Sequence, residues 1–208
     1  MFALVSLTPM SAEPRNEPLS RRAYRQGARA RSAEATRNRI LGATEALLRE
    51  RAAGAVGLEA VALGAATTVP TVLRHFETKD ALVSAAVAAA LARHRAARPR
   101  VSPGDHLGAA RVLAEEYERH APLLRAAEAL PADARRELEA ARRLHRDWLA
   151  RTFADGLTPL APVVHRRRLA QLVAVSGPAP WRTLRETEHL GFVQAQAALA
   201  ELLRALSA

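Results

Sequence analysis

The chain has 208 residues, of which 49% are hydrophobic, 25% are charged and 4% are aromatic, and its formal net charge is +10. This composition is typical of a globular protein with a core of ordinary size. The chain has no cysteine, which excludes disulfide frameworks, cysteine-based zinc sites and thiol nucleophiles. Because aromatic residues are few, Ala, Leu and Val must fill most of the core, and this favours helices.

The sequence contains no uncharged apolar run of about 18 residues, so we expect neither a transmembrane helix nor a membrane partner. The apolar run at residues 2–7 lacks the basic flank and the length of a secretory signal peptide. We therefore expect a cytoplasmic protein.

The positive charge is concentrated in the first half of the chain. Residues 1–100 hold 16 Arg or Lys against 8 Asp or Glu, whereas residues 101–208 hold 15 against 13. Such an excess is typical of a region that binds a polyanion such as nucleic acid. Arg outnumbers Lys by 30 to 1, so the alternative is a solvated, arginine-rich surface.

The pattern of the sequence predicts three segments. Residues 1–31 mix Pro, Ser, Gly and Arg with little periodicity and predict a flexible basic tail. Residues 32–80 predict a small helical domain, and residues 81–208 predict a larger one. The arginines of the tail either reach a DNA minor groove or contact nothing specific: Arg21, Arg22, Arg25, Arg29 and Arg31.

From residue 32 onward the chain predicts an all-α fold of about nine helices separated by short breakers. A first helix covers about 33–52, and short helices follow at 58–65 and 69–75. Thr78 is a good N-cap for a long helix that ends near residue 97. Further helices are expected at about 105–119, 122–129, 132–153, 163–176 and 190–206, with a short extra turn near 181–186.

Two short helices joined by a turn, in the most basic part of the chain, are typical of a helix-turn-helix, whose second helix lies in the DNA major groove. Three runs carry a more specific resemblance: TRNRIL at 36–41, LEAVA at 58–62 and TTVPTVLRHFETKDAL at 67–82. In order and spacing they resemble the N-terminal domain of the TetR family of repressors, over residues 36 to about 83. Beyond about residue 90 only the helical pattern compares, and there the resemblance implies a ligand-binding and dimerising domain.

The resemblance implies DNA contacts at the turn and at the starts of helices. Thr68 matches the residue that caps the recognition helix, residues 69–71 match its exposed first turn, and Pro70 is tolerated there. His75 matches a position that commonly bonds phosphate, although it could be an ordinary surface histidine. Lys79, the only lysine of the chain, matches a family lysine that holds a phosphate. The DNA-contact candidates are Thr36, Arg37, Thr68, Val69, Pro70, Thr71, His75 and Lys79.

Two positions depart from the family pattern. Ala66 occupies the turn position where the family usually has glycine, and a left-handed alanine there would cost about 1 kcal/mol. Leu73 replaces a usual tyrosine, which removes one hydroxyl that could bind phosphate.

The resemblance also implies that the last two long helices pair with their copies in a four-helix dimer interface; packing within one subunit is the alternative. The expected interface residues are Leu169, Leu172, Val173, Phe192, Leu199, Leu202, Leu203 and Leu206. Dimerisation suits DNA binding, because two recognition helices must lie about 34 Å apart to reach successive major grooves.

A ligand pocket is expected among the fourth to seventh helices, where each candidate could also be a core residue. The candidates are Leu91, His94, Leu113, Tyr117, Leu144, His145 and Trp148. His145 is the most interesting, because a buried polar group in an apolar pocket orients a ligand. Since no histidine pair has a metal-binding spacing with a carboxylate, we expect no metal and no other cofactor.

We therefore expect a DNA-binding transcriptional regulator, not an enzyme: a homodimeric repressor that a small-molecule effector releases from a palindromic operator. It would act in a bacterial cytoplasm, on the nucleoid when bound to DNA. One alternative is a DNA-binding dimer without an effector. Another is an enzyme on a helical bundle, against which the sequence shows no Gly-rich phosphate loop and no nucleophile elbow.

Overall fold

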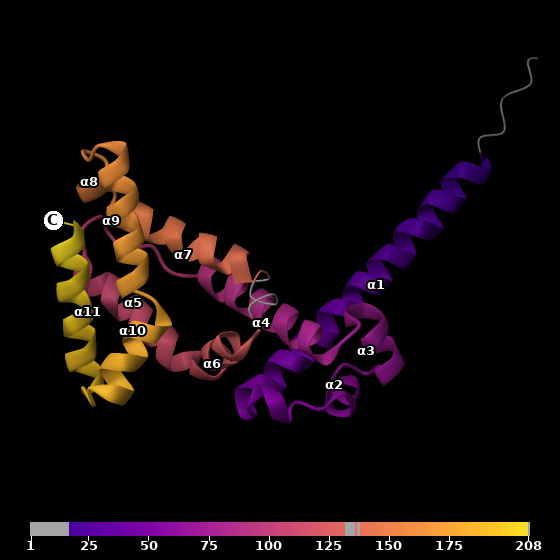
Figure 1. Cartoon of the computed structure of the whole chain (residues 1–208). Coiled ribbons are helices and arrows are strands. Elements are labelled where there is room, and N and C mark those ends of the chain that lie inside the picture. The colour runs from indigo at the N-terminus through magenta and orange to yellow at the C-terminus, as the bar shows by residue number, and fades with distance from the viewer. Residues whose placement is uncertain (1–16, 132–135, 137, 208) are drawn as a thin grey trace, which may run out of the picture. The chain divides into compact units, whose positions relative to one another are not determined.

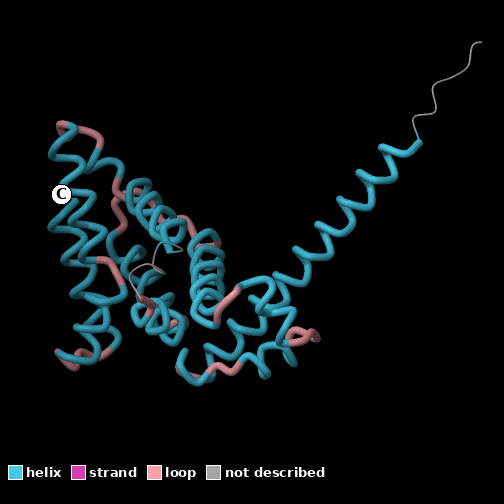
Figure 2. Tube along the Cα trace, turned by 45° about the vertical axis from the view of Figure 1, so that its right-hand side comes forward, coloured by secondary structure: helices cyan, strands magenta, loops and turns pink. Residues whose placement is uncertain are grey.

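The computed structural model describes residues 17–131, 136 and 138–207, and every regular element in that part of the chain is helical (Figures 1 and 2). The all-α prediction is therefore confirmed, with eleven α-helices in the described residues where about nine were expected. The chain divides into two compact units, the first ending at Asn38 and the second beginning at Arg39. Each unit is described on its own.

Helix α1 (Glu17–Glu50) begins well before residue 33, the predicted start. Pro18 is tolerated in the first turn, where backbone N–H groups lack helical partners. The Ala, Arg and Gln residues that follow are good helix formers and outweigh the single Gly27. The segment predicted as a flexible tail is therefore helical from residue 17 to 31, and its residues 1–16 lie outside the described residues.

Four elements follow α1 in the second unit: η1 (Ala53–Ala55), α2 (Leu58–Gly64), α3 (Val69–Phe76) and α4 (Lys79–Ala96). The last three lie where the sequence predicted them. Ile40, Val61, Val72 and Phe76 are buried, so α2, α3 and the second half of α1 share an apolar core. That core holds the helix-turn-helix together.

The rest of the second unit comprises α5 (His106–Arg119), α6 (Ala121–Ala129), α7 (Glu139–Thr152), α8 (Ala154–Leu157), α9 (Pro162–Val175), α10 (Pro178–Arg182), the π-helical turn η3 (Thr183–Thr187) and α11 (Phe192–Ser207). The short turn expected near 181–186 is thus present as the end of α10 and η3. The helix predicted over 132–153 is described as helix α7, and residues 132–135 and 137 lie outside the described residues. Helix α8 was not expected.

Alanine-rich faces allow these helices to pack closely. Helix α4 packs against α6 and α7, and α11 packs against α5 and α9 (Figure 1). Ala109, Ala110 and Ala114 of α5 and Ala195 of α11 are all buried. Small side chains let helix axes approach, so the low aromatic content found in the sequence is matched by an Ala and Leu core. None of the helices in the described residues is both long and apolar enough to cross a membrane.

Candidate nucleic-acid interface and ligand cavity

The first turn of α3 is fixed by its own residues and open to solvent. The Thr68 hydroxyl caps the helix by accepting a hydrogen bond from the Thr71 backbone N–H at 3.4 Å, and it lies 3.1 Å from the Thr71 hydroxyl. Thr68 and Pro70 are exposed, and Val69 and Thr71 are half-buried. A helix N-terminus presents backbone N–H groups and the positive end of the helix dipole. This turn can therefore meet an anion such as a DNA phosphate.

The turn before α3 closes α2 with a Schellman motif. The Thr67 N–H donates to the Ala62 carbonyl at 2.9 Å, and the Ala66 N–H donates to the Leu63 carbonyl at 3.1 Å. Ala66 has a φ of 49°, the left-handed conformation that glycine adopts most easily. The departure from glycine found in the sequence therefore falls at a left-handed position.

A side chain of α1 supports the same turn. Arg39 Nε donates a hydrogen bond to the Ala65 carbonyl at 3.3 Å, and this carbonyl belongs to the C-cap residue of α2. The contact is not apparent from the sequence, because the two residues are 26 positions apart. Arg39 thus positions the turn that leads into the recognition helix.

Lys79 is the first residue of α4, and its ammonium donates a hydrogen bond to the Gly54 carbonyl at 2.8 Å. The Thr78 hydroxyl caps α4 by accepting from the Ala81 N–H at 3.1 Å, as the sequence predicted. Because an ammonium has three N–H donors, the bond to Gly54 orients the side chain and leaves donors that can meet a phosphate.

The other DNA-contact candidates lie in different surroundings. His75 is half-buried in the last turn of α3, with its ring 6.3 Å from that of Phe76. Arg74, beside it, is exposed and was not among the candidates. Thr36 and Arg37 belong to the first unit, where the Thr36 hydroxyl donates to the Ser32 carbonyl at 3.0 Å. The structure therefore gathers residues 68–71, His75 and Lys79 on α3 and the start of α4.

A cavity of about 370 Å³ opens between α4, α6, α7, α9 and the start of α10. This volume lies in the range of small-molecule sites. Most of the wall is apolar, and the charged or polar groups in it come from Arg95, Glu128, Arg142 and His145. The lining residues are Leu91, Arg95, Leu124, Ala127, Glu128, Leu138, Ala141, Arg142, His145, Val173, Gly177 and Pro178.

A buried polar network lies behind this cavity. Arg98 donates two hydrogen bonds to the Glu116 carboxylate, at 2.8 and 2.7 Å, and its Nη1 lies 3.1 Å from His145 Nδ1. Since a guanidinium only donates, His145 Nδ1 accepts and the ring proton sits on Nε2, 3.1 Å from the Ser176 hydroxyl. Tyr117 OH donates to the Ser176 carbonyl. The network links α5, α7 and the end of α9.

Burial and charge set the protonation of the network. Burial, with the neighbouring Arg98 and Arg95 guanidinium groups, holds the pKa of His145 well below its usual range, so the ring stays neutral. Burial likewise raises the pKa of Tyr117, which keeps the phenol protonated as a donor.

Of the residues proposed for a ligand pocket, the structure brings Leu91 and His145 together at the cavity. Leu113 is fully buried and Leu144 half-buried, and Trp148 Nε1 donates to the Pro99 carbonyl at 3.0 Å. The His94 ring stacks on His120 at 3.8 Å, and its Nε2 lies 3.4 Å from Glu45 Oε1. Arg95 was not among the candidates, because its place in the wall depends on how α4 packs against α6 and α7.

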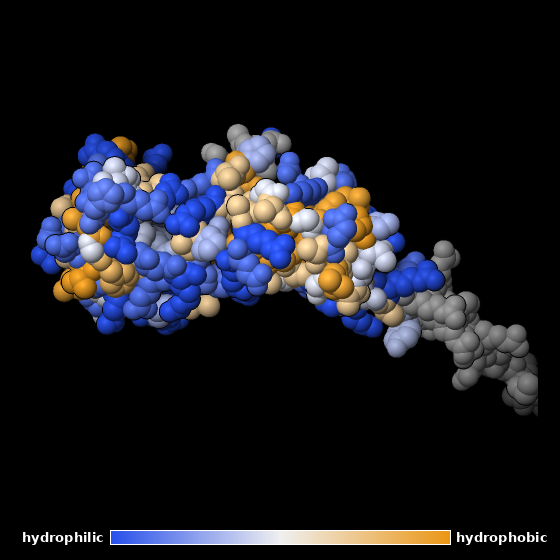
Figure 3. Space-filling view, turned by 90° about the horizontal axis from the view of Figure 1, so that it is seen from below, coloured by the Kyte–Doolittle hydropathy of each residue, from blue (hydrophilic) through white to orange (hydrophobic). Residues whose placement is uncertain are grey.

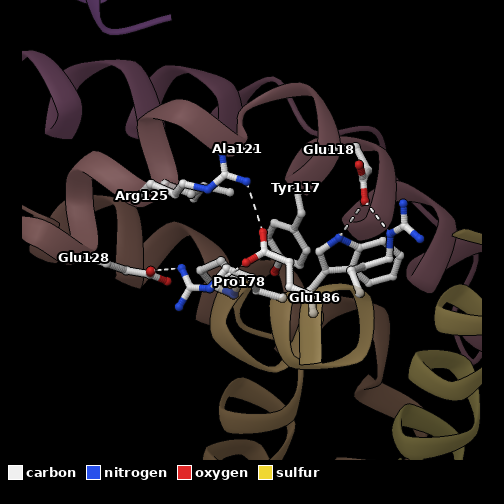
Figure 4. A pocket seen from close by; sticks show the side chains of 11 residues that line it. Tyr117, Glu118, Ala121, Arg125, Glu128, Pro178 and Glu186 are labelled. Carbon is white, nitrogen blue, oxygen red and sulfur yellow. Dashed lines mark hydrogen bonds and ion pairs between the residues drawn. The ribbon is translucent and has the colours of Figure 1, made fainter. Parts of the chain in front are cut away.

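A second, much smaller pocket of about 60 Å³ lies beside Tyr117, between α5, α6, α10 and η3 (Figure 4). Three ion pairs cross it: Arg125 with Glu186 at 3.0 Å, Arg185 with Glu118 at 2.9 Å, and Arg182 with Glu128. The Trp181 Nε1 donates to Glu118 at 3.2 Å. Because this pocket is small and its charged side chains are already paired, it is a poor site for a ligand.

The residues expected at a dimer interface have two kinds of surroundings. Leu169, Leu172, Leu199 and Leu203 are buried within the chain itself. The other four keep some exposure, and Leu202 of α11 is 40% exposed: Val173, Phe192, Leu202 and Leu206. Val163 of α9 and Val193 of α11, which were not among the expected residues, are 69% and 76% exposed. Among the described residues, no group of three or more His, Cys, Asp or Glu side chains is arranged to hold a metal ion.

A capped helix-turn-helix followed by a helical bundle with a cavity defines the class of helix-turn-helix proteins. Residues 40–86 match the model of the family described as bacterial regulatory proteins, tetR family. The resemblance found in the sequence over residues 36 to about 83 is thereby confirmed.

Solved structures show that the similarity of fold extends beyond this segment. A TetR transcriptional regulator from Rhodococcus sp. RHA1 is 17% identical, with a TM-score of 0.57 over 83% of this chain and 96% of that chain. A tetR-family transcriptional regulator from Streptomyces coelicolor is also 17% identical, with a TM-score of 0.59 over 83% and 80% of the two chains. No curated protein matches the chain. The chain thus has the fold of DNA-binding transcriptional regulators.

Proposed function

We propose that this chain is a transcriptional repressor that binds a near-palindromic operator as a homodimer and leaves it when a small molecule enters the cavity. It acts in the cytoplasm of a bacterium, on the nucleoid when bound. The observation that carries the proposal is the exposed, Thr68-capped first turn of α3, which lies within the residues that the family model matches.

The proposed DNA contacts divide by chemistry. Residues 68–71 meet base edges and the nearest phosphate, because the first residues of a recognition helix enter the major groove. Lys79, His75 and the exposed Arg74 meet phosphates on either side. Thr36 and Arg37 are further backbone contacts.

The direct test is selection of bound fragments from genomic DNA by the full chain. Enrichment of one near-palindromic site is expected. Recovery of fragments without a shared sequence would overturn the repressor proposal. Thr71→Ala should change the preferred bases, whereas the matched Thr158→Ala, at an exposed threonine far along the chain, should not.

We place the homodimer interface on the exposed faces of α9 and α11, with Leu202, Val163 and Val193 as its apolar contacts. Figure 3 shows one face of the molecule, on which hydrophobic surface comes in separate patches between hydrophilic side chains. Sedimentation of the wild type should give a dimer and Leu202→Glu a monomer with reduced operator affinity. Leu107→Glu, at a 57% exposed leucine of α5, is the control that should remain dimeric.

Release by an effector requires two forms of the dimer. The effector must bind more tightly to the form whose recognition helices do not match successive major grooves, because a ligand with equal affinity for both forms shifts nothing. The cavity between α4 and α9 is the proposed site of that differential binding, since α4 follows directly on the helix-turn-helix.

A further inference from the structure

The cavity wall contains a buried positive charge that the described residues only half neutralise. The Arg95 side chain is 8% exposed and lines the cavity. Its Nε lies 3.7 Å from Glu116 Oε1, close enough for an ion pair but too far for a hydrogen bond, and has no hydrogen-bond partner among the described residues. Buried charged groups normally have such partners, so this guanidinium is an unusual wall residue.

The nearest carboxylate is already committed to another arginine. Both oxygens of Glu116 accept hydrogen bonds from Arg98, whose side chain is 1% exposed. Two buried guanidinium groups, Arg95 and Arg98, therefore share one carboxylate, and His145 beside them is neutral. Among the described residues this cluster carries one excess positive charge.

The remaining charges of the wall are paired away from the cluster. Glu128 forms an ion pair with Arg182. Arg142, more than half exposed at the rim, lies 3.5 Å from Glu139. These two groups therefore neither supply the missing negative charge nor add a second buried positive one.

The rest of the cavity wall determines which kind of ligand fits beside Arg95. Leu91, Leu124, Leu138, Ala141 and Val173 present hydrocarbon to a space of about 370 Å³. Apolar surface of this kind favours an aliphatic or aromatic ligand body, because both hydrocarbon surfaces leave water when they meet. One end of such a ligand would meet Arg95, and the rest would meet the leucines.

We propose that the cavity binds an apolar molecule with a single carboxylate, which Arg95 holds. The monoanion matches the single excess charge, whereas a phosphate monoester carries nearly two negative charges at neutral pH and would leave one of them buried and unmatched. A guanidinium suits a carboxylate because its N–H groups can donate to both oxygens. This assignment deepens the proposed function and rests on it only for the step from binding to DNA release.

The test titrates the full chain by calorimetry with hexanoate, octanoate and decanoate, each beside the alcohol of the same length and below its micelle-forming concentration. A hydrogen bond to a charged group is worth about 1.5–3 kcal/mol, so each carboxylate should bind about tenfold or more tightly than its alcohol. Octyl phosphate should bind more weakly than octanoate. Equal binding of acid and alcohol, tighter binding of the phosphate, or no binding of any probe would overturn the assignment.

Variants of residues in the cavity wall test which side chain causes the preference for the acid over the alcohol. Arg95→Met keeps an unbranched apolar stem that reaches about as far as Nε but removes the charged end, and it should remove the preference for the acid while alcohol binding persists. Arg95→Lys retains a charge and should retain part of the preference, which covers the case in which Arg95→Met does not fold. Arg151→Met, at an exposed arginine of α7, is the matched control and should bind as the wild type does. A preference that survives in Arg95→Met would contradict the role of this residue.

Operator binding by the same preparations separates the two proposals. If the chain selects a DNA site but binds no carboxylate, only the ligand assignment fails. If it binds octanoate through Arg95 and selects no DNA, the cavity assignment stands and the repressor proposal fails.

Discussion

In the helix-turn-helix the hydroxyl groups that cap α3 and α4 bond to neighbours in the sequence, whereas around the cavity the polar groups bond to distant residues. Thr68 and Thr71 are three positions apart, as are Thr78 and Ala81. At the cavity, Arg98 is 18 positions from Glu116 and 47 from His145, and His145 is 31 from Ser176. A capped turn can therefore form locally, but the buried network exists only when α5, α7 and α9 are packed against the segment that follows α4. The first region depends on backbone conformation, and the second depends on buried charge.

Breaking the buried charge pair should have the largest effect. Glu116→Gln leaves Arg98 and Arg95 buried without a carboxylate, and the expected loss is about 3–5 kcal/mol of unfolding free energy. Urea denaturation of the full chain measures it. The neighbouring Glu115→Gln changes an exposed residue and should cost less than about 0.5 kcal/mol. Similar values for the two variants would mean that the network does not stabilise the cavity region.

Removing the lone lysine should weaken DNA binding with little dependence on sequence. Lys79→Ala removes one charge at the start of α4, so the plot of log affinity against log salt should become shallower by about one unit. Filter binding to an operator and to unrelated DNA measures both slopes. A loss confined to the operator, with binding to unrelated DNA intact, would argue against a phosphate contact.

Replacing the left-handed Ala66 tests how far the helix-turn-helix depends on backbone conformation. Ala66→Gly removes the cost of a positive φ and should raise the unfolding free energy by about 1 kcal/mol. The control Ala46→Gly places glycine within α1, where it should lower that free energy by about 1 kcal/mol. Thermal unfolding of both variants provides the measurement. A lower melting temperature for Ala66→Gly would refute the interpretation of this turn.

Acidification should destabilise the folded chain, and this effect should be the smallest of the four. Burial lowers the pKa of His145, His120 and His106, so below about pH 6.5 the unfolded chain binds protons that the folded chain does not. Stability is therefore complete above about pH 6.5 and is lost as the pH falls towards the lowered values. Thermal unfolding from about pH 8 to about pH 5 should show this decline. His145→Gln should make it shallower, and a melting temperature that rises on acidification would contradict the argument.

Features that depend on a few adjacent residues could be predicted from the sequence. These are α2 and α3, the Thr68 and Thr78 caps, and the departure at Ala66, because capping and left-handed turns are local. The helical stretch of residues 17–31 was not predicted, because its Gly, Pro and Ser are typical of a flexible segment although its Ala, Arg and Gln are good helix formers. The contacts of Arg39 and Lys79 with backbone carbonyls were not predicted either, because they join residues that are 26 and 25 positions apart.

The sequence by itself determined an all-helical chain with a capped recognition helix, since helix propensity, N-caps and breakers act within one or two turns of backbone. The tertiary structure alone decided which polar residues meet around the cavity. In the packed structure His145 and Arg95 line the cavity, whereas Trp148 donates a hydrogen bond to the Pro99 carbonyl. The reason is physical: the cost of burying a charge is set by its neighbours in space, and these are known only once α4 has packed against α6 and α7.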